Sequence, residues 1–232
     1  MGDSRPGTVL QASRWLLIVL LAISYPLAEL LPRSAGWENG WIEHAQLATL
    51  IGGFVFALWM HRRANGTRPT HDAAVARRFA AIALPFWLIC AARETSWGAT
   101  LFTPGIPTMD GRYYTSSILW YHPAIAPLVL IVVGCIVLAF VRWRLDRPLL
   151  QLVRARRFPW IELGLTLSGA MLSALAEGKF HIALPGPERT LMVMEEGTEL
   201  LCYAGLLLTQ ACLFSRLRSM PGPQSAVSPP RA

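Results

Sequence analysis

The spacing of apolar and polar positions is the strongest signal in the chain. Six apolar runs, at about 15–31, 42–60, 79–98, 119–141, 160–177 and 190–214, are separated by polar segments and show no internal repeat. As helices that rise about 1.5 Å per residue, all six can cross the roughly 30 Å of hydrocarbon in a bilayer. We therefore predict an all-α fold: a polytopic membrane helix bundle of six transmembrane helices within residues 1–218.

The two ends of the chain differ in character. Arg5 and Arg14 precede the apolar core of the first run, as in a signal peptide, but no small-x-small cleavage site follows it. We expect a retained helix that Pro26 can kink. Residues 219–232 are rich in proline and serine and have no apolar period. They are expected to form a disordered cytoplasmic tail.

The arginines predict the orientation of the helices. Positive residues stay on the cytoplasmic side of a membrane, and 16 of the 21 basic residues fall on one side of the predicted bundle. With four acidic residues, that side has a net charge of +12, whereas five basic and ten acidic residues give the other side −5. Both termini are then cytoplasmic.

Composition supports a membrane location. The chain is 53% hydrophobic and 15% charged, which is too apolar for an average soluble domain. Its formal charge of +7 comes from arginines between apolar runs rather than along one amphipathic face, so we expect no nucleic-acid partner. Twenty arginines beside one lysine suggest a GC-rich bacterial genome. We expect a multi-pass protein of the bacterial inner membrane, with the lipid bilayer as its partner; protein partners do not follow from the sequence.

Ionisable residues recur at one depth in five of the six runs. Glu43, Glu94, His122, Glu177 and Glu199 each lie 16 to 20 residues from a cytoplasmic arginine, which is about 24 to 30 Å along a helix. Ionised groups in hydrocarbon are costly unless they face one another or a wet cavity. The sequence therefore predicts a polar pocket at the extracytoplasmic side of the membrane.

The densest acidic cluster is the stretch MEEGTELL in the last run. Glu195 and Glu199 stand at i and i+4 and share a helix face, while Glu196 lies about 100° round. Like charges at this spacing repel each other. Protonation, an arginine such as Arg93, or a metal ion must compensate.

This layer supplies candidate ligands and catalytic groups. Glu177 and His181 also stand at i and i+4 if the fifth helix continues through Gly178, and they offer groups that a divalent metal such as zinc accepts. The candidate metal ligands are Glu94, His122, Glu195, Glu199, Glu177 and His181. The candidate catalytic residues are Glu43 or Glu196 as general base, Arg93 to hold an anion, and Ser96 in the pocket wall. For each residue a structural role stays open, as an interfacial charge or a packing ion pair.

The segment 99–118 is the longest on the extracytoplasmic side. It has two prolines and an Asp-Gly pair, which indicate turns. A loop of this length with aromatic residues is either a lid over a site or an interfacial or re-entrant cap.

Four motifs together resemble a group of largely uncharacterised bacterial polytopic membrane proteins. In that group an E-x-S-W-G motif follows an acidic start of the second helix and precedes a histidine and a Glu-Glu pair. The matching stretches, within about residues 38–208, are ENGWIEHAQL, RETSWG, WYHP and EEGTELL. The resemblance implies a coherent site but names no reaction.

More distantly, the chain is similar to the membrane hydrolase superfamily that includes alkaline ceramidases, which are seven-helix zinc enzymes acting on lipid amides. This resemblance implies that Glu94 and Ser96 match the glutamate and serine of the superfamily and that His122 or His181 matches a ligand. The chain differs in its six predicted spans and in lacking a paired histidine motif in the last run.

Three functions agree with the pattern. The first is a metal-dependent membrane hydrolase that acts on a lipid or amphipathic substrate, in which the metal lowers the pKa of a bound water toward about 7. The second is a non-enzymatic accessory or sensor subunit. The third is a proton-coupled transporter, which the absence of acids deep in the inner halves of the runs and of an inverted repeat disfavours.

Overall fold

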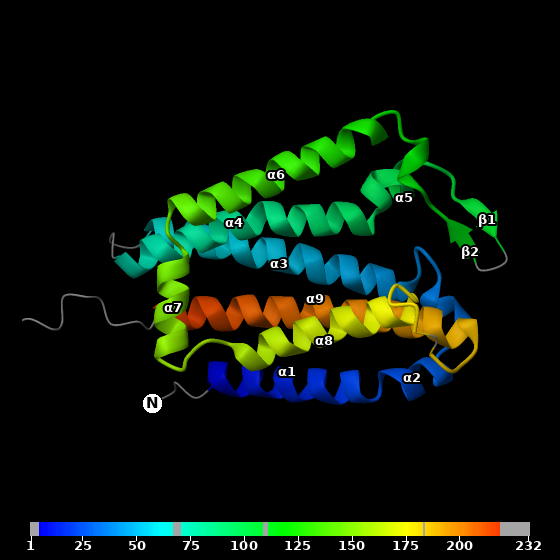
Figure 1. Cartoon of the computed structure of the whole chain (residues 1–232), viewed down its shortest axis with the longest axis horizontal. Coiled ribbons are helices and arrows are strands. Elements are labelled where there is room, and N and C mark those ends of the chain that lie inside the picture. The colour runs from blue at the N-terminus through cyan, green and yellow to red at the C-terminus, as the bar shows by residue number, and fades with distance from the viewer. Residues whose placement is uncertain (1–4, 67–70, 109–110, 183, 219–232) are drawn as a thin grey trace, which may run out of the picture.

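The computed structural model describes residues 5–66, 71–108, 111–182 and 184–218, and the chain is almost entirely helical (Figure 1). The larger helices are α1 (Arg5–Ala22), α2 (Ser24–Leu30), α3 (Trp41–Gly66), α4 (His71–Glu94), α6 (His122–Arg142), α7 (Asp146–Arg154), α8 (Trp160–Ala176) and α9 (Glu188–Arg218). The shorter elements are η1 (Arg33–Gly36), η2 (Ser96–Gly98), α5 (Ala99–Phe102), η3 (Ser116–Ile118), β1 (Ile106–Thr108) and β2 (Gly111–Tyr113). The predicted all-α fold is thus confirmed, with one short hairpin added. The predicted tail, 219–232, lies outside the described residues.

Several helices are compatible with a membrane. Within the described part of the chain, α3, α4, α6 and α9 are long and apolar enough to cross one, and the bent pair α1 and α2 would make a fifth span. The remaining apolar helix, α8, has 17 residues, whereas about 20 are typical of a span. Length and composition therefore give four or five spans where the apolar pattern predicts six.

The first apolar run is broken in the middle. α1 and α2 meet at an angle of 69°. The break follows from Pro26, because a proline ring clashes with the carbonyl four residues earlier and lacks an amide hydrogen to donate. That carbonyl belongs to Ala22, where α1 ends.

α9 is the central helix of the bundle. α8, α3, α2 and α1 pack around it (Figure 1), and buried residues occur along its whole length, from Thr190 to Leu217. Small residues allow close approach to α8: a Cβ atom added at Gly169 would lie 2.8 Å from the backbone nitrogen of Cys202. The residues in the first turns of α9, like those further along it, therefore lie in the middle of the bundle.

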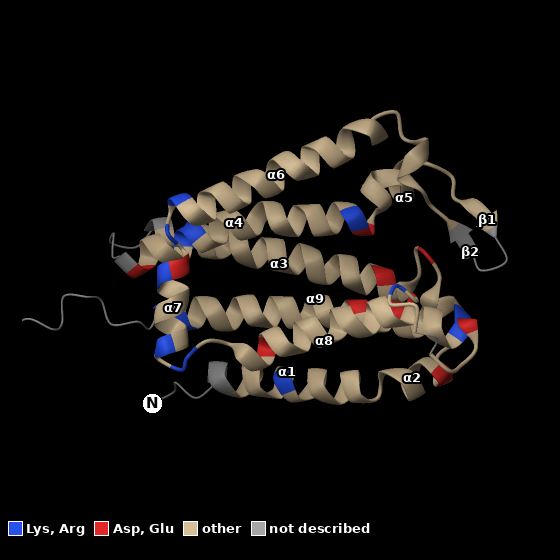
Figure 2. Cartoon of the chain, viewed as in Figure 1, with Lys and Arg blue, Asp and Glu red and all other residues tan. Residues whose placement is uncertain are grey.

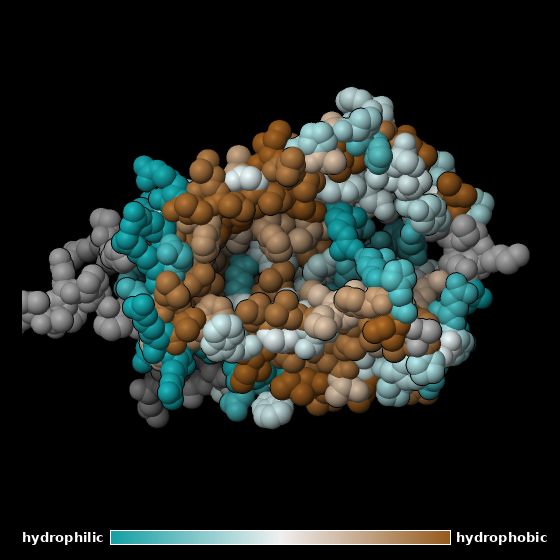
Figure 3. Space-filling model, viewed as in Figure 1, coloured by the Kyte–Doolittle hydropathy of each residue, from teal (hydrophilic) through white to brown (hydrophobic). Residues whose placement is uncertain are grey.

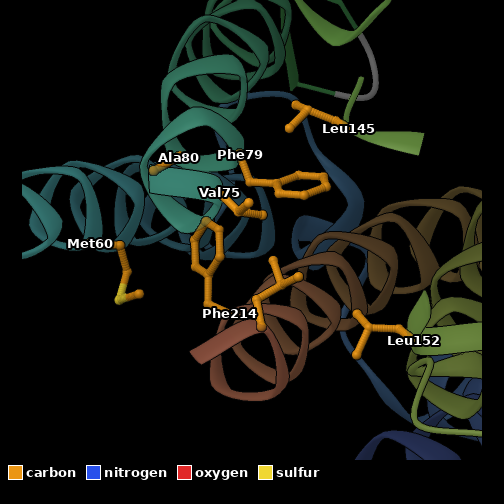
Figure 4. Close-up of a cluster of buried hydrophobic side chains, with 8 residues drawn as sticks. Met60, Val75, Phe79, Ala80, Leu145, Leu152 and Phe214 are labelled. Atoms are coloured by element: carbon orange, nitrogen blue, oxygen red, sulfur yellow. The ribbon is translucent and has the colours of Figure 1, made fainter. Parts of the chain in front are cut away.

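α7 crosses the opposite end of the bundle (Figure 1). Leu145, just before α7, and Leu152, within it, are buried against α4 and α9, where they join a cluster with Val75, Phe79 and Phe214 (Figure 4). In contrast, α6 packs mainly against α4 and has no buried residue. The apolar surface that results forms a band across the molecule (Figure 3).

Charge is divided between the two ends of the bundle. Basic residues gather around α7, and most acidic residues lie at the other end (Figure 2). This is the charge asymmetry that the sequence predicts for the two sides of a membrane.

The segment 99–118 contains α5, the hairpin and η3. β1 and β2 are antiparallel, with Ile106 opposite Tyr113, and Asp110 of the predicted turn lies outside the described residues. The backbone amide of Tyr114 donates a hydrogen bond to Glu38 Oε2 at 2.6 Å. This bond tethers the segment to the residues that precede α3, at the acidic end of the bundle.

Candidate functional site

The stretch RETSWG ends α4 in a left-handed turn. Ser96, Trp97 and Gly98 have consecutive φ angles of 46°, 59° and 93°, a conformation that costs residues other than glycine about 1–2 kcal/mol each. The Gly98 amide donates to the Thr95 carbonyl at 2.8 Å, and the Tyr121 hydroxyl donates to the Trp97 carbonyl at 2.7 Å. These hydrogen bonds stabilise the turn. The turn ends α4 at Glu94, whose carboxylate lies beside α9.

Three carboxylates converge between α4 and α9. We call Glu94, Glu196 and Glu199 the carboxylate centre, because one oxygen from each lies within 4.8 Å of the others. Glu94 is the last residue of α4. Glu196 and Glu199 stand three residues apart on α9, which places their side chains on the same side of the helix.

Arg93 and Tyr203 connect these acids. Arg93 Nη1 donates to Glu199 Oε1 at 2.7 Å and to Tyr203 Oη at 3.2 Å. The Tyr203 hydroxyl lies 2.9 Å from both Glu94 Oε2 and Glu199 Oε1, and its single proton can serve one of them at a time. Tyr203 therefore bridges the acids of the two helices.

A buried glutamine supports the third acid. Gln46 is 0% exposed, and its Nε2 donates to the Glu196 carbonyl at 2.8 Å and to Glu196 Oε2 at 3.0 Å. Its Oε1 atom is buried and has no hydrogen-bond partner among the described residues. A buried acceptor left unsatisfied costs about 1–3 kcal/mol, so this atom marks a place where a water molecule would be stabilised.

The charges of the carboxylate centre are not balanced. Arg93 is the single basic residue that forms an ion pair with it among the described residues, against three acids. Carboxylates this close cannot all be ionised without a large repulsion. The centre is therefore suited to hold a shared proton or a cation.

Glu43 lies across a small cavity from this centre. Its carboxylate accepts a hydrogen bond from the Asn39 backbone amide, just before α3. Glu43, His44 and Thr100 line a cavity of about 190 Å³ together with Glu94. The residue that the sequence suggests as a base thus shares a cavity with one acid of the centre.

Glu195 and Glu177 lie to one side. Glu195 interacts electrostatically with Glu177 and Lys179 as well as with Glu199 and Arg93, but its carboxylate is not one of those that converge within 4.8 Å. Lys179 Nζ forms an ion pair with Glu177 Oε2 at 2.5 Å. The expected i and i+4 pairing of Glu177 with His181 does not occur, because α8 ends at Ala176. Gly178, with φ of 80°, terminates the helix in the left-handed conformation.

The two histidines among the predicted residues do not join the carboxylate centre. His122 is the exposed first residue of α6, and His181 is exposed between α8 and α9. Ser96 belongs to the left-handed turn. In the described part of the chain, only Glu94, Glu196 and Glu199 come close enough together to form a set of ligands.

Sequence reasoning missed Tyr203, Gln46 and the buried acid Glu162. Tyr203 stands four residues after Glu199, so helical spacing could have identified it. Glu162, in the first turn of α8, is 1% exposed and forms an ion pair with Arg14 of α1. No pattern in the sequence pairs these two residues, because they come from helices far apart along the chain.

Comparisons with protein-family models, curated protein sequences and solved structures found no match to this chain.

Proposed function

We propose that the chain is a bacterial inner-membrane protein of six spans whose carboxylate centre binds a divalent cation and supports hydrolysis of a lipid or other membrane-proximal substrate. The observation that carries this proposal is the convergence of Glu94, Glu196 and Glu199 within 4.8 Å between two apolar helices. Three acids at such a place need a compensating positive charge, and a divalent cation supplies one.

Two observations support six spans with both termini in the cytoplasm. α8 is about 26 Å long at roughly 1.5 Å per residue, close to the thickness of the hydrocarbon, and it packs along α9. The basic end of the bundle also matches the side on which positive residues are retained. The carboxylate centre then lies toward the extracytoplasmic surface.

The ligands offered here are all oxygen atoms. Carboxylate oxygens favour hard cations such as Mg²⁺, Mn²⁺ and Ca²⁺, whereas zinc favours sets that include nitrogen or sulfur. Because His122 and His181 lie apart from the centre, we propose a hard cation in preference to zinc.

The residues of the site suit hydrolysis in distinct ways. A bound cation would polarise a carbonyl or phosphoryl group and activate water. Arg93, whose side chain is 59% exposed, can hold an anionic head group or a developing negative charge. Glu43 faces the cavity beside Glu94 and can accept a proton from water. Tyr203 keeps Glu94 and Glu199 together.

A second candidate, proton-coupled transport, has one observation in its favour. Acids that relay protons are expected at more than one depth. Glu162 is such an acid, buried in the first turn of α8 beside Arg14 and Cys212. We rank it second because Glu162 is already neutralised by Arg14.

The proposal is tested with protein reconstituted in vesicles that contain fluorogenic lipid esters and amides. We expect Mn²⁺- or Mg²⁺-dependent hydrolysis that a chelator abolishes and that Glu196→Gln reduces at least about 100-fold. Glu188→Gln, at the exposed start of α9, is the matched control and should retain the activity. Cation binding without turnover would instead indicate a sensor subunit, and solute flux that survives chelation would indicate a transporter.

A further inference from the structure

A large basic pocket lies at the opposite end of the bundle from the carboxylate centre. It has a volume of about 740 Å³ and lies between the start of α4, the end of α6 and α7. Five arginines line it: Arg78, Arg142, Arg144, Arg147 and Arg157. Asp72 is the one acidic residue in the lining, so the pocket walls have a net charge of +4.

The turn between α6 and α7 brings these arginines together. Arg144 has a φ of 50°, its amide donates to the Val141 carbonyl at 3.0 Å, and the Leu145 amide donates to the Phe140 carbonyl at 3.1 Å. This pattern is a Schellman motif, in which a left-handed residue terminates a helix and redirects the chain. The redirected chain places Arg144 and Arg147 beside the start of α4.

The guanidinium groups in this pocket are available to a ligand. The side chains of Arg142, Arg144 and Arg147 form no hydrogen bond or ion pair with any residue that the structure describes. A guanidinium group has five N–H donors in a planar arrangement that matches phosphate oxygens. Several unpaired guanidinium groups around one cavity favour a ligand with phosphate oxygens.

The surroundings of the pocket are apolar. Val75, Leu145 and Leu152 lie in the pocket wall and belong to the buried cluster beneath α7 (Figure 4). Above Arg142, the lipid-facing surface of α6 exposes Leu138 and Val141 at 67% and 64%. A ligand with a phosphate group and a long apolar part would place the phosphate group among the arginines of the pocket and the apolar part along α6.

We propose that this pocket binds the phosphate group of an anionic phospholipid from the leaflet at the basic end, with the acyl chains along α6. Basic pockets between helices on the cytoplasmic side are suited to anionic head groups. Free phosphate has no apolar part, so it would make no contact with the exposed apolar surface of α6. The site is separate from the carboxylate centre, and Glu199→Gln should leave it unchanged.

The test is a titration of purified, delipidated protein in detergent with dioleoylphosphatidylglycerol or dioleoylphosphatidylcholine, with bound lipid counted by native mass spectrometry. We expect the anionic lipid to bind at least about tenfold more tightly. The double variant Arg144→Gln with Arg147→Gln should weaken this binding about 25-fold, from roughly fivefold for each arginine.

The matched control is Arg154→Gln with Arg156→Gln. These two exposed arginines belong to the same end of the molecule but do not line the pocket, and Arg156 has a left-handed φ of 54°, much like Arg144. The control should bind the anionic lipid like the wild type. Should the pocket variant lack a cooperative thermal transition, Arg142→Gln replaces it, with an expected loss of about fivefold.

Three outcomes would overturn the proposal. Equal losses in the two double variants would mean that binding depends on total surface charge rather than on the pocket. Equal affinity for the two lipids would exclude recognition of the anionic head group. Full competition by inorganic phosphate or glycerol 3-phosphate would identify a soluble ligand as the occupant.

Discussion

At the scale of single residues, Tyr203 links Glu94 and Glu199, two of the three acids of the carboxylate centre. It is 6% exposed, and its hydroxyl lies 2.9 Å from an acid on α4 and from an acid on α9. Without the Tyr203 hydroxyl, Glu94 and Glu199 would lose the hydrogen bonds that join them. The remaining link would be the positive charge of Arg93, whose side chain is largely exposed.

We expect Tyr203→Phe to weaken Mn²⁺ binding about tenfold, the loss typical of removing a hydrogen bond to a ligand. The ring is kept, so the thermal transition should move little. Calorimetric titration in detergent measures the affinity. An unchanged affinity would show that the bridge does not position the ligands.

The sequence predicts part of this site. Counting along each helix gives the depth of a residue, which is why Glu94 and Glu199 were correctly expected to lie at one level. Which residues face each other depends on the rotation and packing of the helices, and neither follows from depth. Glu196 was therefore expected as a general base and not as a candidate ligand beside Glu94 and Glu199, and Gln46 was not singled out.

At the scale of elements, close packing of α3 on α4 depends on a glycine. A Cβ atom added at Gly53 would lie 2.5 Å from the ring of Trp87, which is buried and donates a hydrogen bond to Gln210. The ring cannot easily move away, because both its packing and its hydrogen bond hold it.

We expect Gly53→Ala to lower the free energy of unfolding by about 1–3 kcal/mol through overpacking. Gly52→Ala is the matched control, since a Cβ atom at this exposed neighbour would meet nothing within 4 Å. It should be neutral or stabilising by up to about 1 kcal/mol. Thermal denaturation of both variants in the same detergent compares their stabilities. A similar loss of stability in the two variants would contradict the prediction.

The helices themselves were predictable, because each long apolar run is largely helical, the first of them as the bent pair α1 and α2. The breaks were harder to predict. The bend before Pro26 followed from a known property of proline. The fifth run was expected to end at about residue 177, one residue beyond the end of α8, but continuation through Gly178 stayed open because a glycine inside an apolar pattern can also continue a helix. The left-handed turn at Ser96 and Trp97 has no signal in the sequence, since neither residue favours a positive φ.

At the scale of the whole molecule, the proposed six spans place successive loops on opposite sides of the membrane. Single cysteines at Gly105 and Glu188 should react with an impermeant maleimide added outside intact cells, whereas one at Arg156 should react only after lysis. The background is a chain with its four native cysteines replaced. Equal reactivity at Arg156 and Glu188 would show that α8 does not cross the membrane.

The central claim is that the carboxylate centre binds a divalent cation. Its most direct test is the Mn²⁺ content of the wild type, Glu199→Gln and the control Glu188→Gln after equilibrium dialysis, measured by plasma mass spectrometry. The account predicts about one Mn²⁺ per chain in the wild type and the control, with at least tenfold weaker binding in Glu199→Gln. No stoichiometric Mn²⁺ in the wild type, or equal binding in all three proteins, would contradict it.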